Sequence, residues 1–222
     1  MVLLHARSHS VAAVTSTWVI VVAAGSGSRF GGAKQYAPLL GRRVVDWAID
    51  EARVVADGLV LVVPPDQVDE PEPAVDEVVA GGETRSESVR NGLAAVPDDV
   101  DVVLVHDGAR PLATRALFRT VADAVLAGAE AVVPAMAMVD TITDEHGNPA
   151  DRDSLRSVQT PQGFDASALR QVHAPRPEAT DDATLVVAAG GRFRQVTGER
   201  WNFKITEPED LRVAEAILER RR

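Results

Sequence analysis

The sequence predicts an α/β fold, with a mostly parallel sheet that carries helices on both faces. Short, unbroken runs of β-branched residues recur at residues 18–22, 59–63 and 101–105, and such runs are typical of strands buried on both sides. Between these runs lie segments whose apolar residues repeat at helical spacing. Strands that alternate with helices form a parallel sheet covered on both faces.

The alternation can be followed along the whole chain. The first half is expected to contain a strand (18–22), a glycine-rich loop, a helix (44–56), a strand (59–63), an acidic, proline-rich loop or short helix (66–76), a short strand (78–79), a helix from the glycines at 81–82 to about residue 96, and a strand (101–105). The second half is expected to contain a helix (114–127), a strand (131–134), helices at 165–173 and 181–189, strands at 193–196 and 203–206, and a final helix. Thr114 is expected as an N-cap. Thr206 and Glu209 fit a capping box for the final helix, with Pro208 in its first turn.

Residues 139–162 interrupt this pattern. They are polar and lack a helical stripe; 139–143 alternates like a strand, 144–148 resembles a turn, and 157–160 could return as a partner strand. We therefore expect a hairpin arm that projects from the domain. The arm has little apolar surface of its own, so it either packs on a second subunit or forms a loose loop, and the pattern alone favours neither.

Composition narrows the class of protein. The chain has 222 residues, of which 45% are hydrophobic and 25% charged, which suits one α/β domain or two very small ones. The absence of cysteine excludes disulfides, thiol catalysis and cysteine-bound metals, and makes a cytoplasmic location the default. No apolar run approaches a membrane span. A net charge of −10 argues against nucleic acid as the main partner, whereas a small anionic substrate needs only local cations.

No internal repeat or linker divides the chain, so residues 18–222 are expected to form a single domain. Residues 1–17 contain no acidic residue, and their apolar pieces are too short for a signal peptide. We expect this segment to be an extension that is either disordered or added to the natural chain.

The loop at residues 23–34 is the first candidate site. It combines four glycines with Arg29 and Lys34, and glycines let backbone N–H groups approach a ligand while cations add charge, so the loop favours polyphosphate binding. An ordinary glycine-rich turn is the alternative. Two familiar phosphate motifs fail here, because Phe30 occupies the third glycine of the dinucleotide fingerprint and Ala33 follows Gly32 where a P-loop needs lysine. The failed fingerprint disfavours a dehydrogenase.

Three polar segments are expected to meet at the carboxyl ends of the strands, where open parallel sheets bind ligands. They are the glycine-rich loop, residues 81–88 and residues 106–110. Asp107 follows the fourth strand and is placed to bind a divalent cation such as Mg²⁺, which takes few protein carboxylates and completes its shell with phosphate and water; a turn residue in an Asp-Gly pair is the alternative. Without a nucleophile elbow or a zinc-binding helix motif, phosphoryl or nucleotidyl transfer remains.

Several motifs follow one another in a recognisable order. They are Ala23-Ala24-Gly25-x-Gly27-x-Arg29, Lys34-Gln35, Gly81-Gly82-x-x-Arg85-x-x-Ser88-Val89, Val105-His106-Asp107-x-Ala109-Arg110-Pro111, Asp140-Thr141, Arg152, Gln159-Thr160-Pro161-Gln162-x-Phe164, Thr180-Asp181-Asp182-Ala183 and Lys204-x-Thr206-x-Pro208-Glu209-Asp210-Leu211. With these motifs the chain resembles the 2-C-methyl-D-erythritol 4-phosphate cytidylyltransferase family over residues 19–218. The resemblance implies a Rossmann-like nucleotidyltransferase fold and a Mg²⁺-dependent reaction of CTP with a phosphorylated polyol that releases pyrophosphate.

The resemblance also implies roles for individual residues. The cytidine and its phosphates would be held by Ala23, Ala24, Gly25, Gly27, Gly82 and Ser88. Arg29 and Lys34 would stabilise charge at the α-phosphate, and Asp107 would bind Mg²⁺. The polyol phosphate would be held by Arg110, Thr141, Arg152 and Lys204, with Arg152 and Lys204 positioning it for catalysis. Since Thr141 and Arg152 would come from the arm of another subunit, the resemblance favours a homodimer.

The resemblance leaves some alternatives open. The nearest is a ribitol-5-phosphate cytidylyltransferase, whose motifs are very similar; a guanylyltransferase or a uridylyltransferase fits less well. A non-catalytic nucleotide-binding module is a different class, disfavoured because binding alone would not need Arg29, Lys34, Asp107 and Lys204 together. Val22 and Phe203 depart from commoner residues of the family without removing a functional group. Arg156 is an extra cation near Arg152 and could share its role.

Overall fold

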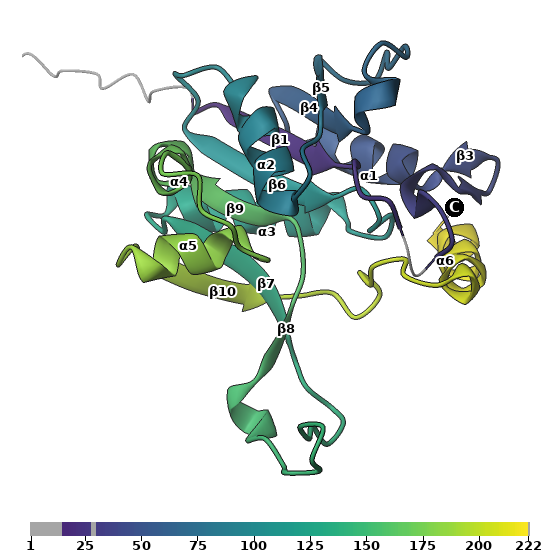
Figure 1. The fold of residues 1–222 in the computed structure, drawn as a ribbon, viewed down its shortest axis with the longest axis vertical. Helices are drawn as coiled ribbons and strands as arrows, with labels where there is room; N and C mark the ends of the chain where they lie inside the picture. The colour runs from purple at the N-terminus through teal and green to yellow at the C-terminus, as the bar shows by residue number, and fades with distance from the viewer. Residues whose placement is uncertain (1–14, 28–29, 222) are drawn as a thin grey trace, which may run out of the picture.

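A computed structural model describes residues 15–27 and 30–221 of the chain. Its centre is an eight-stranded sheet with the order β10-β7-β9-β6-β1-β4-β5, in which β8 also pairs with β7 (Figure 1). The strands are β1 (Thr17–Val22), β4 (Gly58–Val63), β5 (Glu77–Ala80), β6 (Val102–Asp107), β7 (Ala131–Ala137), β8 (Arg156–Val158), β9 (Gln162–Asp165) and β10 (Phe193–Thr197). β1, β4, β5 and β6 run parallel, as do β7 and β10, whereas β9 is antiparallel to both β6 and β7. The expected α/β fold with a mostly parallel sheet is confirmed.

Helices cover both faces of this sheet because the central strands are apolar on both sides. Along β1, Val19 and Val21 point to one hydrophobic cluster and Ile20 to the other, following the alternation of a strand. The first cluster packs against α1 (Val44–Arg53) and α3 (Arg115–Leu126). The second packs against α2 (Arg85–Ala94), α4 (Ala166–His173) and α5 (Asp182–Ala188). Among the described residues, no helix has the length and apolarity to cross a bilayer.

A smaller cluster lies beside α6 (Pro208–Arg221). It joins that helix to the short hairpin of β2 (Pro38–Leu39) and β3 (Arg42–Arg43) and includes the buried Ile205. The expected strand at 203–206 is wrong. This segment is irregular, because Ile205 makes one backbone bond to the Ala109 carbonyl (2.8 Å) and packs on α6 instead of joining a strand ladder.

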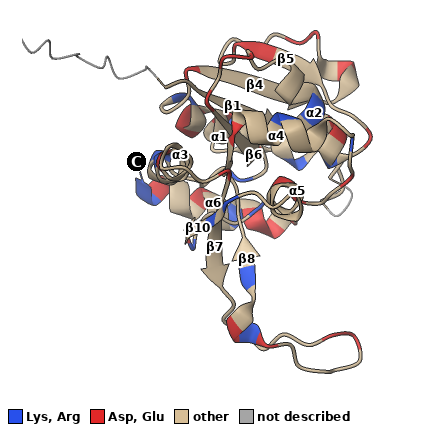
Figure 2. Ribbon diagram, turned by 90° about the vertical axis from the view of Figure 1, so that its left-hand side faces the viewer, with Lys and Arg blue, Asp and Glu red and all other residues tan. Residues whose placement is uncertain are grey.

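The hairpin arm is present, but its strands differ from those expected. At its base the end of β7 pairs with β8, so that Ala135 lies opposite Val158 and Ala137 opposite Arg156. The arm stands clear of the body in both views (Figures 1 and 2). The expected strand at 139–143 is wrong: its one pairing is an isolated bridge from Thr143 to Pro149. Val139 is 83% exposed. The apolar residues of this alternating segment therefore have no buried surface to pack against.

Other differences are local. β9 is a further strand that the sequence pattern did not predict; it is short, follows Pro161 and contains Gly163. The β2–β3 hairpin was also not predicted, since each strand has only two residues. α1 ends at Arg53, three residues earlier than expected, because the next residues form a turn onto the Ala52 carbonyl.

The start of α6 is capped by a different residue from the expected one. Asp210, not Glu209, provides the acceptor: its Oδ2 accepts hydrogen bonds from the Thr206 amide (2.7 Å), the Thr206 hydroxyl (2.9 Å) and the Glu207 amide (3.0 Å). Burial alone would raise the pKa of Asp210, but these hydrogen bonds outweigh burial and the pKa is lowered. The carboxylate is therefore the form that stabilises this helix terminus.

Asp210→Ala is expected to lower the free energy of unfolding by about 1 kcal/mol at pH 7, the usual cost of losing a cap. Because the folded pKa is below the unfolded value, this contribution is present above the unfolded pKa of about 3.9 and is lost as the pH falls through the folded pKa. Urea unfolding at pH 7 and at pH 3 measures the difference. Glu209→Ala is the matched control and should change stability by no more than about 0.5 kcal/mol. An equal gap at both pH values would contradict a carboxylate cap.

Candidate functional site

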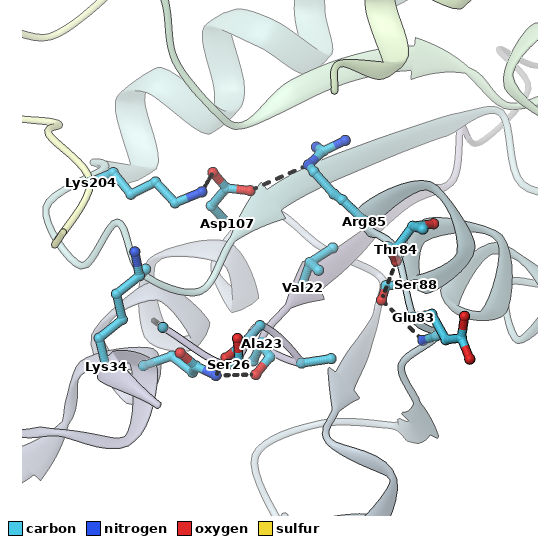
Figure 3. Close-up of a pocket in the computed structure, with 16 residues that line it drawn as sticks. Val22, Ala23, Ser26, Lys34, Glu83, Thr84, Arg85, Ser88, Asp107 and Lys204 are labelled. Atoms are coloured by element: carbon cyan, nitrogen blue, oxygen red, sulfur yellow. Dashed lines mark hydrogen bonds and ion pairs between the residues drawn. The ribbon is translucent and has the colours of Figure 1, made fainter. Parts of the chain in front are cut away.

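A cavity of about 450 Å³ opens where segments distant in sequence meet at the carboxyl ends of β1 and β6 (Figure 3). The expected site residues that line it are Ala23, Ala24, Gly25, Gly27, Lys34, Gly82, Ser88, Asp107 and Lys204. The predicted convergence of the glycine-rich loop, residues 81–88 and residues 106–110 is thus present, the last segment contributing Asp107 and Ala109. Arg29, also expected here, lies outside the described residues.

The glycine-rich loop is held in shape by one buried amide. The Gln35 Nε2 donates to the carbonyls of Ala23 (2.5 Å) and Gly25 (2.8 Å). Gly27 has a φ of +65°, and a side chain there would put its Cβ 1.9 Å from the Gly32 carbonyl oxygen, so this turn requires glycine. At Gly25, by contrast, a Cβ would meet nothing within 4 Å. The loop therefore presents open backbone to the cavity.

The second wall is the amino-terminal end of α2. Ser88 Oγ accepts from the Gly82 amide (3.1 Å) and donates to the Thr84 carbonyl (2.9 Å), while Thr84 Oγ1 caps the Glu87 amide. A Cβ at Gly81 would lie 2.2 Å from the Ala24 Cβ, so this segment packs directly against the glycine-rich loop. Since a helix amino terminus carries partial positive charge, this wall favours an anionic ligand.

Asp107 lies at the centre of a cluster of cations. Its Oδ2 accepts from Lys204 Nζ at 2.9 Å, and the Nε atoms of Arg85 and Arg110 each lie 3.8 Å from a carboxylate oxygen. Burial alone would raise the pKa of Asp107, but the three cations together hold that pKa well below its usual range. The group is therefore a carboxylate throughout the physiological pH range.

A buried hydrogen-bond chain fixes the backbone around Asp107. The Asp107 amide donates to Thr160 Oγ1 (3.0 Å). The Thr160 hydroxyl in turn donates its own proton to His106 Nδ1 (3.1 Å). The His106 Nε2–H then donates to the Arg110 carbonyl (3.2 Å). Burial lowers the pKa of His106 to about 4, so the neutral imidazole that this chain needs is the form present. Sequence reasoning gave no role to Thr160, although it belongs to one of the motifs.

The donor set around Asp107 fits Mg²⁺ held jointly with phosphates. No group of three His, Asp or Glu side chains that could hold a metal occurs within residues 15–27 and 30–221, so a cage made of protein side chains alone does not fit. A single carboxylate does fit, because Mg²⁺ commonly keeps one or two carboxylates and completes its shell with phosphate oxygens and water. The Asp107 Oδ1 has a contact with Arg85 at 3.8 Å, too long for a hydrogen bond, and is available as a ligand.

The remaining expected residues lie outside this cavity. Arg110 is buried next to Asp107 and donates to the Asn202 carbonyl (2.7 Å), but it is not among the lining residues. Thr141 and Arg152 belong to the arm, and Arg152 Nη1 donates to the Val139 carbonyl (2.8 Å). Neither arm residue lines the cavity of its own chain.

Sequence reasoning gave no role to several residues that line the cavity. Arg85 is the most notable, because it is, after Lys204, the second cavity-lining cation beside Asp107. Its position at the start of α2, three residues after the pair Gly81-Gly82, was the signal that could have identified it. The others are Val22, Gln35, Glu83, Thr84 and Ala109.

Comparison with known proteins identifies a matching family and several similar proteins. Residues 17–220 match the family described as IspD: 2-C-methyl-D-erythritol 4-phosphate cytidylyltransferase. The chain is 43% identical over 221 residues to the 2-C-methyl-D-erythritol 4-phosphate cytidylyltransferase of Nocardia farcinica, covering 93% of this chain and 95% of that one. It is 41% identical to the bifunctional enzyme IspD/IspF of Nitratidesulfovibrio vulgaris, covering 90% of this chain and 58% of that one. The crystal structure of 2-C-methyl-D-erythritol 4-phosphate cytidylyltransferase from Thermus thermophilus superposes with a TM-score of 0.80 at 36% identity, covering 92% of this chain and 99% of that one.

Proposed function

The chain belongs to the 2-C-methyl-D-erythritol 4-phosphate cytidylyltransferase family, and we propose that its cavity carries out the family's reaction. The enzyme is a CTP-dependent nucleotidyltransferase. It joins CTP and 2-C-methyl-D-erythritol 4-phosphate to give 4-diphosphocytidyl-2-C-methyl-D-erythritol and pyrophosphate, a step in non-mevalonate isoprenoid precursor biosynthesis. The observation that carries the proposal is the single cavity shared by the glycine-rich loop, the start of α2 and the Asp107–Lys204 pair.

The chemistry needs positioning and positive charge more than a general base. The nucleophile is the polyol phosphate, which is already anionic at neutral pH. One of its oxygens bonds to the α-phosphorus of CTP while the bond from that phosphorus to the β-phosphate bridging oxygen breaks, and pyrophosphate leaves. Because two anions must come together, cations around the α-phosphate lower the barrier. Lys34 lines the cavity and, with Arg29, is assigned this role.

The nucleotide is assigned to the two loop walls. The residues assigned to the cytidine and its phosphates all line the cavity: Ala23, Ala24, Gly25, Gly27, Gly82 and Ser88. The open space at Gly25 and the packing of the two walls on each other support this assignment.

Magnesium is assigned to Asp107, together with phosphate oxygens of the substrate. Mg²⁺ bound there would neutralise phosphate charge. Lys204 and Arg110 lie close to the Asp107 carboxylate and are assigned to the incoming polyol phosphate.

The arm is assigned to a partner subunit, which makes the enzyme a homodimer. Thr141 and Arg152 would then complete the polyol-phosphate site of the neighbouring chain. Support comes from the arm itself: it stands clear of the body, and these two residues do not line their own chain's cavity. A cytoplasmic location, where CTP is made, is part of the same proposal.

Arg152→Ala is expected to raise the KM for the polyol phosphate about tenfold, since one charge-assisted hydrogen bond is lost, and to leave the KM for CTP within about twofold. Initial rates measured with each substrate varied in turn separate the two constants. Arg156→Ala is the matched comparison, because Arg156 also lies on the arm but bonds to the carbonyls of Asp153 and Leu155. If Arg156→Ala raised this KM and Arg152→Ala did not, the role would belong to Arg156.

Pyrophosphate release tests the function itself. The enzyme is mixed with CTP and Mg²⁺ and given either 2-C-methyl-D-erythritol 4-phosphate or ribitol 5-phosphate. Release with the first and little with the second is the expected result. Preferential release with ribitol 5-phosphate would change the substrate, and no release with either would support a nucleotide-binding module.

A further inference from the structure

Arg85 is a cavity cation for which the proposed function has given no role. We infer that Arg85 binds a phosphate oxygen at the reaction centre and that the buried Asp182–His173 pair holds it in position. This inference rests on the proposed function, because it assumes that phosphates meet in this cavity.

The placement of Arg85 leaves part of its guanidinium available to a ligand. It is the first residue of α2 and lines the cavity, with 24% of its side chain exposed. Its Nη1 donates to Asp182 Oδ2 at 2.6 Å, whereas its Nε lies 3.8 Å from Asp107 Oδ1, beyond hydrogen-bond distance. Within the described part of the chain, Nε and Nη2 therefore make no hydrogen bond. A planar guanidinium whose remaining N–H groups can donate in parallel suits phosphate oxygens.

The two residues behind Arg85 are almost completely buried. Asp182 is the first residue of α5 and its side chain is 1% exposed; His173 ends α4 and its side chain is 3% exposed. Asp182 Oδ1 bonds with His173 Nε2 at 3.0 Å while Oδ2 accepts from Arg85. Both carboxylate oxygens are therefore used, and the guanidinium is anchored at one end by a group that solvent does not reach.

A purely structural role explains this arrangement less well. A buried ion pair adds little net stability compared with apolar packing of the same volume. In addition, α2 is already tied to the neighbouring segment by Arg90, which donates to the Pro177 carbonyl (2.7 Å) and to Glu178 (2.9 Å) away from the cavity. The two arginines differ in one respect: Arg85 lines the cavity, whereas Arg90 does not.

The position of Arg85 indicates what it binds. Figure 3 shows Arg85 and Lys204 approaching Asp107 from opposite sides, with Lys34 on the side of the glycine-rich loop. A phosphate next to Asp107 would therefore have Lys204 on one side and Arg85 on the other. Both the α-phosphate of the nucleotide and the phosphate of the polyol present the same anionic oxygens, and kinetics can separate these two sources.

Arg85→Ala is expected to lower kcat/KM about twentyfold, the effect of losing one charge-assisted hydrogen bond. A rise confined to the KM for CTP would assign Arg85 to the nucleotide, and a rise confined to the KM for the polyol phosphate would assign it to the second substrate. A fall in kcat alone would indicate contact in the transition state. Arg85→Lys should recover only part of the loss, because it keeps the charge without the fork.

Arg90→Ala is the matched control, since it removes an arginine tie of the same helix that does not reach the cavity. It should leave kcat/KM within about twofold of the wild type, although it can lower stability. The inference is overturned if Arg85→Ala also stays within about twofold, or if Arg85→Lys restores full activity.

The positioning role is tested by a double-mutant cycle. Asp182→Asn should lower kcat/KM about fivefold in the wild-type background and cause no further loss in the Arg85→Ala background, because it acts through Arg85. Additive losses would overturn the positioning role. If Asp182→Asn does not fold, the same cycle is run with His173→Phe, which removes the hydrogen bond to Asp182 while keeping an aromatic ring. An inactive wild-type enzyme would refute the proposed function, whereas an active one with an unaffected Arg85→Ala variant would refute only this inference.

Discussion

Lys34→Ala is expected to lower kcat by about a hundredfold or more, with a much smaller change in the KM for CTP. The reason is that charge grows on the α-phosphate oxygens only as the new bond forms, so a cation directed at them stabilises the transition state more than bound CTP. Lys34 lines the cavity on the side of the glycine-rich loop. Steady-state pyrophosphate release with both substrates varied measures the two constants.

Two further variants support the interpretation of this result. Arg29→Ala is expected to show a loss of the same order, because the two cations are assigned the same role. Arg194→Ala removes an exposed cation from β10 that is not among the residues lining the cavity, and should leave kcat unchanged. Near-normal turnover in both Lys34→Ala and Arg29→Ala would be incompatible with the assigned chemistry.

Asp107→Asn is expected to lower kcat by about a hundredfold to a thousandfold at a fixed Mg²⁺ concentration. Asparagine keeps the size of the side chain but removes the negative charge, so Mg²⁺ would lose the anionic ligand assigned to it while the neighbouring cations remain. The Mg²⁺ concentration that gives half-maximal activity should also rise. Activity is measured across a Mg²⁺ titration, and binding of Mn²⁺ to the enzyme with CTP is followed by its paramagnetic signal as a readout independent of turnover.

The control for this substitution lies at the other end of the same strand segment. Asp101→Asn changes a carboxylate that precedes β6 and accepts from the Ser16 amide (2.9 Å). It should leave both the activity and the Mg²⁺ dependence unchanged. Equal losses in Asp101→Asn and Asp107→Asn would show that the effect arises from stability rather than from a metal ligand.

The sequence predicted those parts of the site that depend on local pattern. Gly25 and Gly27 lie in the loop that follows β1, and Asp107 is the last residue of β6; the carboxyl ends of parallel strands meet at one edge. Because the strands themselves were clear from their apolar runs, the convergence of these loops could be predicted without knowing any contact. Lys204 was different: only the family resemblance placed it near the site, since its segment is irregular and was expected to be a strand.

The rest of the site depends on tertiary packing that a linear pattern does not reveal. The contact of Arg85 with Asp182 needs the amino-terminal ends of α2 and α5 to meet, and the two residues are 97 positions apart. The antiparallel β9 was hidden for another reason. It has only four residues, Gln162–Asp165, and is too short to show a strand period.

The contact between Lys204 and Asp107 has a consequence for how the enzyme is made. The two residues are also separated by 97 positions. A ribosome adds about 5–20 residues per second, so Asp107 is synthesised roughly 5–20 s before its lysine partner. The glycine-rich loop and residues 81–88, which are assigned to the nucleotide, have been synthesised throughout that interval, whereas Lys204 has not. A nascent chain halted between these residues therefore contains the segments assigned to the nucleotide but lacks the lysine assigned to the second substrate.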